Sequence, residues 1–192
     1  MPGRPRSHES QQAIQRATVE LLESRGWSAL TVEGIAAAAG VGKQTIYRWY
    51  DGDLGQIVVE AYIGASDERI EPPDTGSVRS VLGGIVVPVA AMNTDRDRGL
   101  AMANRSLMAH AQVHPTFART YAALHQHWRE PMLEAVRRGI TRGELAGDCD
   151  PDLVVDLLLG LQWYRLLLGH LPTTEEDARS CVDTALARWT VD

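Results

Sequence analysis

The stretch Thr31-Val-Glu-Gly-Ile-Ala-Ala-Ala-Ala-Gly-Val-Gly-Lys-Gln-Thr-Ile-Tyr-Arg-Trp-Tyr50 predicts two short helices joined by a tight turn. The hydroxyl group of Thr31 can cap the first helix, and Glu33 suits the positive end of that helix. Gly40 supplies the left-handed backbone with which a chain often leaves a helix. Small and aliphatic side chains recur at helical spacing on the inward face: Ile35, Ala36 and Ala39. Together these residues indicate a helix-turn-helix.

The second helix of this corner is expected to begin near Gly42 and to direct Ile46 and Trp49 inward. Its outward face then carries donors and acceptors suited to phosphate oxygens and base edges: Lys43, Gln44, Thr45, Tyr47 and Arg48. Lys43 is the only lysine in the chain. The alternative is a corner with an ordinary solvated face, because helix-turn-helix shapes also occur in proteins that do not bind DNA.

The same residues resemble the DNA-binding segment of the tetracycline-repressor (TetR) family of transcription regulators. The run Thr45-Ile-Tyr-Arg48 and the aromatic pair Trp49-Tyr50 are the most specific parts of a resemblance that is strong over residues 10–62. Two positions depart from the family pattern. Gly42 stands where the family usually has Ser, so a side-chain cap is missing. Asp53 stands where the family usually has Lys, and its carboxylate is expected to repel phosphate.

The resemblance implies an all-α homodimer that binds a pseudo-palindromic operator in double-stranded DNA and responds to a small-molecule effector. Repression by operator occupancy is the default role that the family implies, and activation is the alternative. The side chains expected to approach bases are Lys43, Gln44 and Thr45. Those expected to contact phosphates are Thr31, Tyr47 and Arg48, and Gly42 joins the DNA-binding set. The alternative function is a helical small-molecule-binding or interaction protein that no longer binds DNA, and the two departures motivate it.

The N-terminal residues Met-Pro-Gly-Arg-Pro-Arg predict a non-helical arm with two positive charges, Arg4 and Arg6. Such arms can enter a minor groove or lie on phosphates, and the alternative is a disordered tail. Residues 1–50 carry six basic and four acidic side chains, whereas residues 51–192 carry thirteen and twenty-one. A basic head on an acidic body fits DNA binding at one end, although so small a surplus also arises by chance.

About nine helices are expected in 192 residues, since the composition favours helix and β-branched runs bounded by turns are scarce. The strongest breaker is Glu71-Pro-Pro-Asp-Thr-Gly76. The amphipathic helix before it follows the turn Asp51-Gly-Asp53, and the resemblance implies that this helix links the DNA-binding head to the ligand-binding body. We therefore place the functional boundary near residue 50, with a three-helix DNA-binding domain at 1–50 and a ligand-binding and dimerisation domain at 51–192.

The predicted helix 153–168 is apolar over more than half of its circumference, which is more than one partner helix can cover. We therefore expect a second subunit to pack there, and the alternative is a helix buried inside a monomer. The residues assigned to dimerisation on this helix and the last helix are Leu153, Leu157, Leu161, Tyr164, Leu168, Val182, Leu186 and Trp189.

A ligand pocket is expected in the body, because pockets between bundle helices are mostly apolar with a few polar groups. The candidates are Tyr121, His125, Trp128 and Trp163, near the bend predicted at Pro131. Taken alone, each of these side chains is more typical of a core than of a pocket. His110 and His114 have the spacing of two zinc ligands, yet no carboxylate completes a site, so ordinary histidines are expected there.

No cofactor, metal or enzymatic activity is expected. The sequence contains no Gly-x-Ser-x-Gly, phosphate loop or dinucleotide fingerprint. The two cysteines, Cys149 and Cys181, lack metal-ligand spacing and are expected to be packing residues. Because there is no long apolar run and no signal-like N-terminus, we expect a soluble cytoplasmic protein without a membrane segment.

Overall fold

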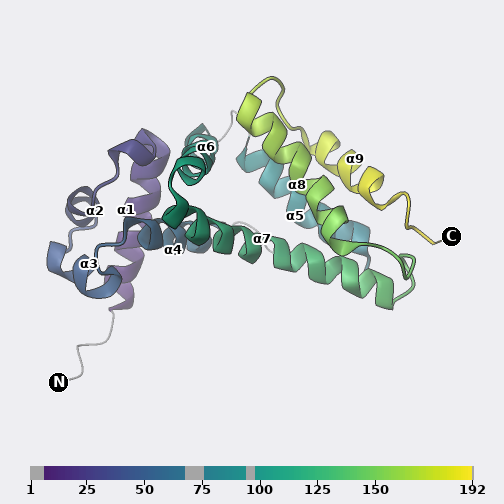
Figure 1. Cartoon of the computed structure of the whole chain (residues 1–192), viewed down its shortest axis with the longest axis horizontal. Helices are drawn as coiled ribbons and strands as arrows, with labels where there is room; N and C mark the ends of the chain where they lie inside the picture. Colours follow the sequence, from purple (N-terminus) through teal and green to yellow (C-terminus); the bar gives the residue numbers. More distant parts are fainter. Residues whose placement is uncertain (1–6, 68–75, 94–97, 192) are drawn as a thin grey trace. The chain divides into compact units, whose positions relative to one another are not determined.

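The computed structural model describes residues 7–67, 76–93 and 98–191, and within these ranges it contains nine α-helices, one 3₁₀ turn and no strand (Figure 1). The helices are α1 His8–Arg25, α2 Val32–Ala38, α3 Lys43–Tyr50, α4 Leu54–Asp67, α5 Val78–Met92, α6 Arg98–Val113, α7 Pro115–Thr141, α8 Pro151–Leu168 and α9 Glu175–Leu186. The 3₁₀ turn η1 is Trp27–Ala29. The all-α expectation is confirmed. None of the described helices is both long and apolar enough to cross a membrane.

The chain divides into two compact units. The first comprises residues 1–68 and 102–124, and the second comprises residues 69–101 and 125–192. The first part of α7 therefore belongs to the first unit and its second part to the second unit. The boundary predicted near residue 50 separates a DNA-binding part from a ligand-binding and dimerisation part, whereas the two units are defined by how the chain packs. The functional boundary stays a prediction.

In the first unit, α1 packs against α4 and α2, and α2 packs against α3. One aliphatic side chain from each helix is almost fully buried at the centre: Ile14 of α1, Ile35 of α2, Ile46 of α3 and Ile57 of α4. Burying such a side chain contributes about 1.5–3 kcal/mol. The apolar spacing read in the sequence thus fixes the short helices of the corner on the longer α1 and α4.

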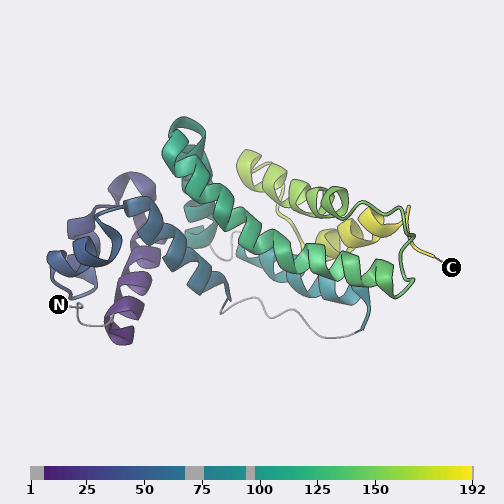
Figure 2. The ribbon, with the colours of Figure 1, turned by 60° about the horizontal axis from the view of Figure 1, so that its bottom comes forward.

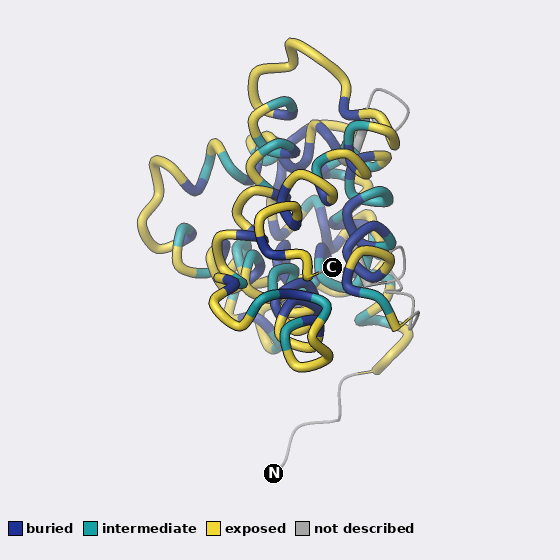
Figure 3. The backbone as a smooth tube through the Cα atoms, turned by 90° about the vertical axis from the view of Figure 1, so that its right-hand side faces the viewer, coloured by how far each residue is buried: buried dark blue, intermediate teal, exposed yellow. Residues whose placement is uncertain are grey.

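In the second unit, α5 packs against α9 and α8, and these helices lie alongside the second part of α7 (Figure 2). Figure 3 colours the backbone by burial, with buried, intermediate and exposed stretches following one another along the chain. Large buried side chains of the shared core are Leu82, Met132, Leu158 and Leu186. Gln162 is also buried, and its Nε2 donates to the backbone oxygen of Val86 at 3.3 Å, which ties α8 to α5.

Helix α9 begins with a capping box that also holds an ion pair. The Thr174 hydroxyl accepts the N–H of Asp177 at 3.1 Å, and the Asp177 carboxylate accepts the N–H of Thr174 at 3.0 Å. Arg165 of α8 donates to the same carboxylate at 2.6 Å. The Arg165 hydrogen bond, followed by the two from Thr174, lowers the pKa of Asp177 to about 2.

We predict that Asp177→Asn lowers stability at neutral pH and removes part of the acid sensitivity. A carboxylate whose folded pKa lies below its ordinary value of 3.8 stabilises the fold above that value. This contribution is lost as the pH falls towards about 2. The variant should be less stable by about 1 kcal/mol at neutral pH, and the difference should shrink between about pH 4 and 2. Urea unfolding at several pH values measures this, with Glu176→Gln in the same turn as the control. An unchanged difference at low pH contradicts the assignment.

Candidate nucleic-acid interface

The corner between α2 and α3 is built as the sequence predicts. The Thr31 hydroxyl accepts the N–H of Gly34 at 3.0 Å and so caps α2. Gly40 turns the chain with a φ of 66°. Gly42 occupies the N-cap of α3 in an extended conformation and offers no side-chain hydrogen bond. These three positions set the direction in which α3 leaves the turn.

The inward anchors of α3 are Ile46 and Tyr50, which are 0% and 2% exposed. Trp49, which was predicted to point inward, is half-buried, so that prediction is met only in part. Residues three and four positions after Ile46 both fall near its face, so helical spacing does not choose between them. The guanidinium carbon of Arg48 lies 5.8 Å from the ring centroid of Trp49, which gives this side chain a polar neighbour.

The outward face of α3 carries the predicted polar side chains. Lys43, Gln44, Tyr47 and Arg48 are exposed, whereas Thr45 is half-buried. The Lys43 ammonium lies 5.4 Å from the ring centroid of Tyr47. The structure thus brings these residues together beside the exposed Thr31. Arg4 and Arg6 lie outside the described residues.

Gly52 is a contributor that the sequence analysis missed. It has a φ of 76° in the turn after α3, and a Cβ atom there would lie 2.7 Å from Cε1 of Tyr47. Glycine at this position therefore leaves space for the Tyr47 ring. The neighbouring Asp53 accepts the N–H of Gln56 at 3.1 Å and caps α4, which gives a structural reason for a carboxylate there.

Glu33 is a second residue of the site whose partner the sequence analysis did not predict. Its carboxylate forms an ion pair with the Lys43 ammonium across the turn between α2 and α3. The hydrogen bond from Lys43 lowers the pKa of Glu33, and the same bond raises the pKa of Lys43. Neither helix pattern reveals this contact, because the two residues are ten positions apart and lie on different helices.

The turn η1 is held in the first unit by residues of α6 and α7. The Ser106 hydroxyl accepts the N–H of Trp27 at 2.8 Å. The Trp27 ring centroid lies 4.1 Å from that of His110 and 4.5 Å from that of Phe117. Burial, followed by the charge of His114, lowers the pKa of His110. Rather than being a simple solvated residue, His110 packs in an aromatic cluster.

The ligand candidates are divided between the two units. Tyr121 belongs to the first unit, where its ring centroid lies 5.9 Å from that of Phe117. In the second unit, the His125 ring centroid lies 5.6 Å from that of Trp128 and 5.1 Å from that of Trp163. Burial, followed by the charge of Arg129, lowers the pKa of His125. Three of the four candidates thus gather in one place.

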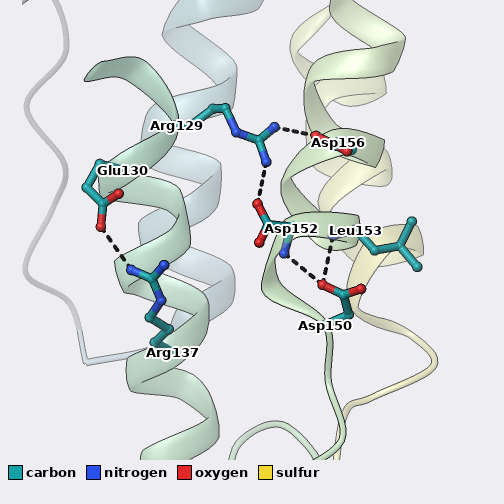
Figure 4. Close-up of polar contacts among 7 residues, drawn as sticks. All are labelled: Arg129, Glu130, Arg137, Asp150, Asp152, Leu153 and Asp156. Carbon is teal, nitrogen blue, oxygen red and sulfur yellow. Dashed lines mark hydrogen bonds and ion pairs between the residues drawn. The ribbon is translucent and has the colours of Figure 1, made fainter. Parts of the chain in front are cut away.

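Arg129 fixes the helices that carry this aromatic group (Figure 4). Its Nη2 donates to Asp152 of α8 at 2.7 Å, and its Nη1 donates to Asp156 one turn further along. Asp150 caps α8 by accepting the N–H groups of Asp152 and Leu153 at 3.0 and 3.3 Å. The second part of α7 and the start of α8 are therefore connected by charged hydrogen bonds as well as by apolar packing. Within the described ranges, no three His, Cys, Asp or Glu side chains gather as a metal site.

The dimerisation residues assigned from the sequence fall into two groups. Those of α8 form a largely exposed apolar row: Leu153 43%, Leu157 47%, Tyr164 59% and Leu168 62% exposed, with Leu161 half-buried. The three assigned on and after α9 lie instead in the core of their own unit: Val182 2%, Leu186 1% and Trp189 6% exposed. Their assignment to an intersubunit surface is corrected here, because the inward face of α9 is already covered by α5 and α8.

Comparisons with known proteins agree with this architecture. Residues 14–52 match the family of bacterial regulatory proteins, tetR family, and residues 72–185 match the tetracyclin repressor-like, C-terminal domain. The uncharacterized HTH-type transcriptional regulator YdeS of Bacillus subtilis (strain 168) is 30% identical over 186 residues, which cover 95% of this chain and 91% of YdeS. The crystal structure of the TetR family transcription regulator SCO0332 has a TM-score of 0.79 at 28% identity, covering 94% of this chain and 98% of that chain.

A helix-turn-helix with a polar outward face, joined to an all-helical body, is typical of a DNA-binding transcription regulator. The chain belongs to the tetracycline-repressor (TetR) family, since both parts of that family's sequence pattern match it. Two structures at 17% identity share the fold with a TM-score of 0.69: a regulator from Saccharomonospora viridis in complex with choline and FadR from Bacillus subtilis in complex with stearoyl-CoA.

Proposed function

We propose that this protein represses transcription as a homodimer that binds a pseudo-palindromic operator and releases it when a small-molecule effector binds. The observation that carries the proposal is the outward face of α3, where exposed polar side chains stand over the buried anchor Ile46. The protein acts in the cytoplasm and catalyses no reaction. Its control of transcription then depends on occupancy of the operator alone.

The proposed contacts divide between bases and backbone. Two copies of α3 related by a two-fold axis enter successive major grooves about 34–36 Å apart. Lys43, Gln44 and Thr45 approach base edges from the first turn of α3. Tyr47 and Arg48, together with Thr31 at the start of α2, contact phosphates, and Arg4 and Arg6 add contacts from the N-terminal arm.

The exposed row on α8 supports dimerisation. Five large apolar side chains of α8, and Leu171 just after it, are at least 43% exposed, and exposure of so many neighbouring apolar side chains to water is unfavourable. A two-fold axis would pack the row of one subunit against the same row of the other, so that both rows are covered. The α8 row would thus hold the two subunits together.

The effector site is proposed at His125, Trp128 and Trp163, with Tyr121 as the fourth candidate. The ring centroid of His125 lies within 6 Å of those of Trp128 and Trp163. These rings are on helices that the hydrogen bonds of Arg129 connect. Other members of this fold bind choline and stearoyl-CoA, which supports a small-molecule site in the body. A ligand that prefers a head spacing mismatched to the grooves lowers DNA affinity by population shift.

Selection from random duplex DNA tests the proposal. Purified protein is mixed with the pool at moderate salt, and the retained duplexes are sequenced. Enrichment of a pseudo-palindrome supports the regulator, and the recovered operator then permits a screen for compounds that release it. No enrichment by a folded dimer supports the alternative, a helical binding protein whose head no longer contacts DNA.

We predict that Lys43→Ala weakens operator binding about tenfold or more, because a base contact by a lysine contributes to discrimination between base pairs. Tyr47→Phe should weaken binding about fivefold through the loss of one hydroxyl contact to phosphate. Both thermal midpoints should shift by less than about 2 °C, since both side chains are exposed. Titrations of the recovered operator measure the affinities.

Arg179→Ala is the matched control, because it removes one exposed positive charge from α9 in the second unit. The operator affinity of this variant should remain that of the wild type. If Lys43→Ala and Tyr47→Phe also retain wild-type affinity, the assignment of the outward face of α3 to DNA is wrong.

A further inference from the structure

Glu33 and Lys43 form an unusual pair at the proposed interface. Lys43 is the only lysine of the chain, and Glu33 is the only acidic residue between Thr31 and Tyr50. Their side chains form an ion pair while remaining 59% and 51% exposed. The pair therefore lies on the surface that is proposed to face DNA, rather than in the core of the corner.

The position of the ammonium group is fixed from two sides. Glu33 is the second residue of α2, and Lys43 is the first residue of α3, so the turn at Gly40 brings them together. The Tyr47 ring, one turn further along α3, approaches the same ammonium at 5.4 Å. Lys43 is thus held on the outward face of α3 before any DNA arrives.

We propose that Glu33 is a specificity-determining residue. Its carboxylate permits Lys43 to donate hydrogen bonds to an uncharged base edge but repels a phosphate group at the same place. This inference rests on the proposed DNA-binding function. An ammonium group has three donors, so Lys43 can keep its bond to Glu33 while donating to O6 and N7 of a guanine. Those two acceptors carry only partial negative charges, so a carboxylate repels them less strongly than it repels an ionised phosphate.

A phosphate group at the same place meets a different environment. It brings a negative charge within a few ångströms of the Glu33 carboxylate, and like charges at that distance repel. Phosphates occur at every position on DNA, whereas guanine edges occur only at particular positions. Glu33 therefore weakens binding to arbitrary sequence more than binding to the operator, which raises the ratio of the two affinities.

The test uses Glu33→Gln, which keeps the shape of the side chain and removes its charge. The full-length dimer is titrated with the recovered operator and with a scrambled duplex of equal length. Affinity for the scrambled duplex should rise about two- to 30-fold for two heads, the range expected from two exposed ion pairs. The salt dependence on that duplex should steepen by about 0.9 for each phosphate gained. Operator affinity should change less, so selectivity should fall.

Two further variants separate this role from a general effect of charge. Asp51→Asn removes a negative charge from the same unit at a left-handed position that asparagine tolerates, and it should leave selectivity unchanged. In a Lys43→Met background, Glu33→Gln should alter selectivity much less, because no ammonium group then brings a phosphate close to the carboxylate. An equal rise in affinity for both duplexes, or an effect of undiminished size without Lys43, overturns the inference.

A measurement without DNA tests the pair itself. Lysine-selective carbon-13 labelling gives one side-chain signal, since the chain has a single lysine. Glu33→Gln should lower the pKa of Lys43 towards its ordinary value. An unchanged pKa overturns the pairing, even where the wild-type protein binds its operator. A wild-type protein that does not distinguish the two duplexes instead contradicts the proposed function.

Discussion

Gly26→Ala is expected to lower the free energy of unfolding of the first unit by about 2–4 kcal/mol. Gly26 has a φ of 70° and a ψ of 179°, a region that is almost closed to residues with a Cβ atom. A Cβ atom at this position would also lie 3.0 Å from Oγ of Ser106. That oxygen accepts the N–H of Trp27, so the substitution both strains the backbone and disturbs the hydrogen bond that holds η1.

Gly40→Ala provides the comparison for this prediction. Gly40 also has a positive φ, of 66°, but no atom lies within 4 Å of a Cβ atom built there. Only the backbone strain remains, and the expected loss is about 1 kcal/mol. Urea unfolding of both variants, with hydrogen exchange of the α1 and α4 amides, measures the difference. Equal losses at the two glycines would contradict the prediction that the closed backbone region of Gly26 and its contact with Ser106 add to the cost of a Cβ atom.

The second large effect is expected from the double variant Leu157→Glu and Tyr164→Glu, which should be monomeric and lose at least about 100-fold in operator affinity. These side chains are 47% and 59% exposed on α8, so glutamate at either position is solvated in a monomer. In the proposed dimer the same carboxylates would be buried without a partner, and each would cost several kcal/mol. A single head then binds half of the operator.

Val113→Glu is the control for this variant. Val113 ends α6 in the first unit and is 70% exposed, so the same change of chemistry occurs away from the α8 row. Sedimentation equilibrium should give a dimer for the wild type and for Val113→Glu, and a monomer for the double variant. A double variant that remains dimeric would place the subunit interface elsewhere on the chain.

Much of the fold could be read from the sequence because local chemistry determines helix ends. Thr31 and Thr174 cap helices through their own hydroxyl groups, and Gly40 adopts the left-handed backbone expected of it. Helical spacing was less informative about which face is covered. It could not distinguish Trp49 from Tyr50 as the inward residue of α3. The apolar spacing of the buried face of α9 is also the same as that of the exposed row of α8.

The site was predictable where residues act alone and not where they act in pairs. The polar face of α3 follows from one helix and its spacing. The ion pair of Glu33 and Lys43 depends on the angle between two helices, and the bond from Trp27 to Ser106 joins residues 79 positions apart. Aromatic residues of a pocket and of a core are the same residue types, so the grouping around His125 required the structure.

The inclusion of residues 102–124 in the first unit limits how the protein can be rearranged by engineering. A chimaera that joins this head to the body of a relative at residue 50 or 68 would lose the hydrogen bond of Ser106 and the rings of His110 and Phe117. The head is therefore not a module that can be transplanted as a single piece of sequence. An exchange of DNA specificity between family members must transfer two separated segments together.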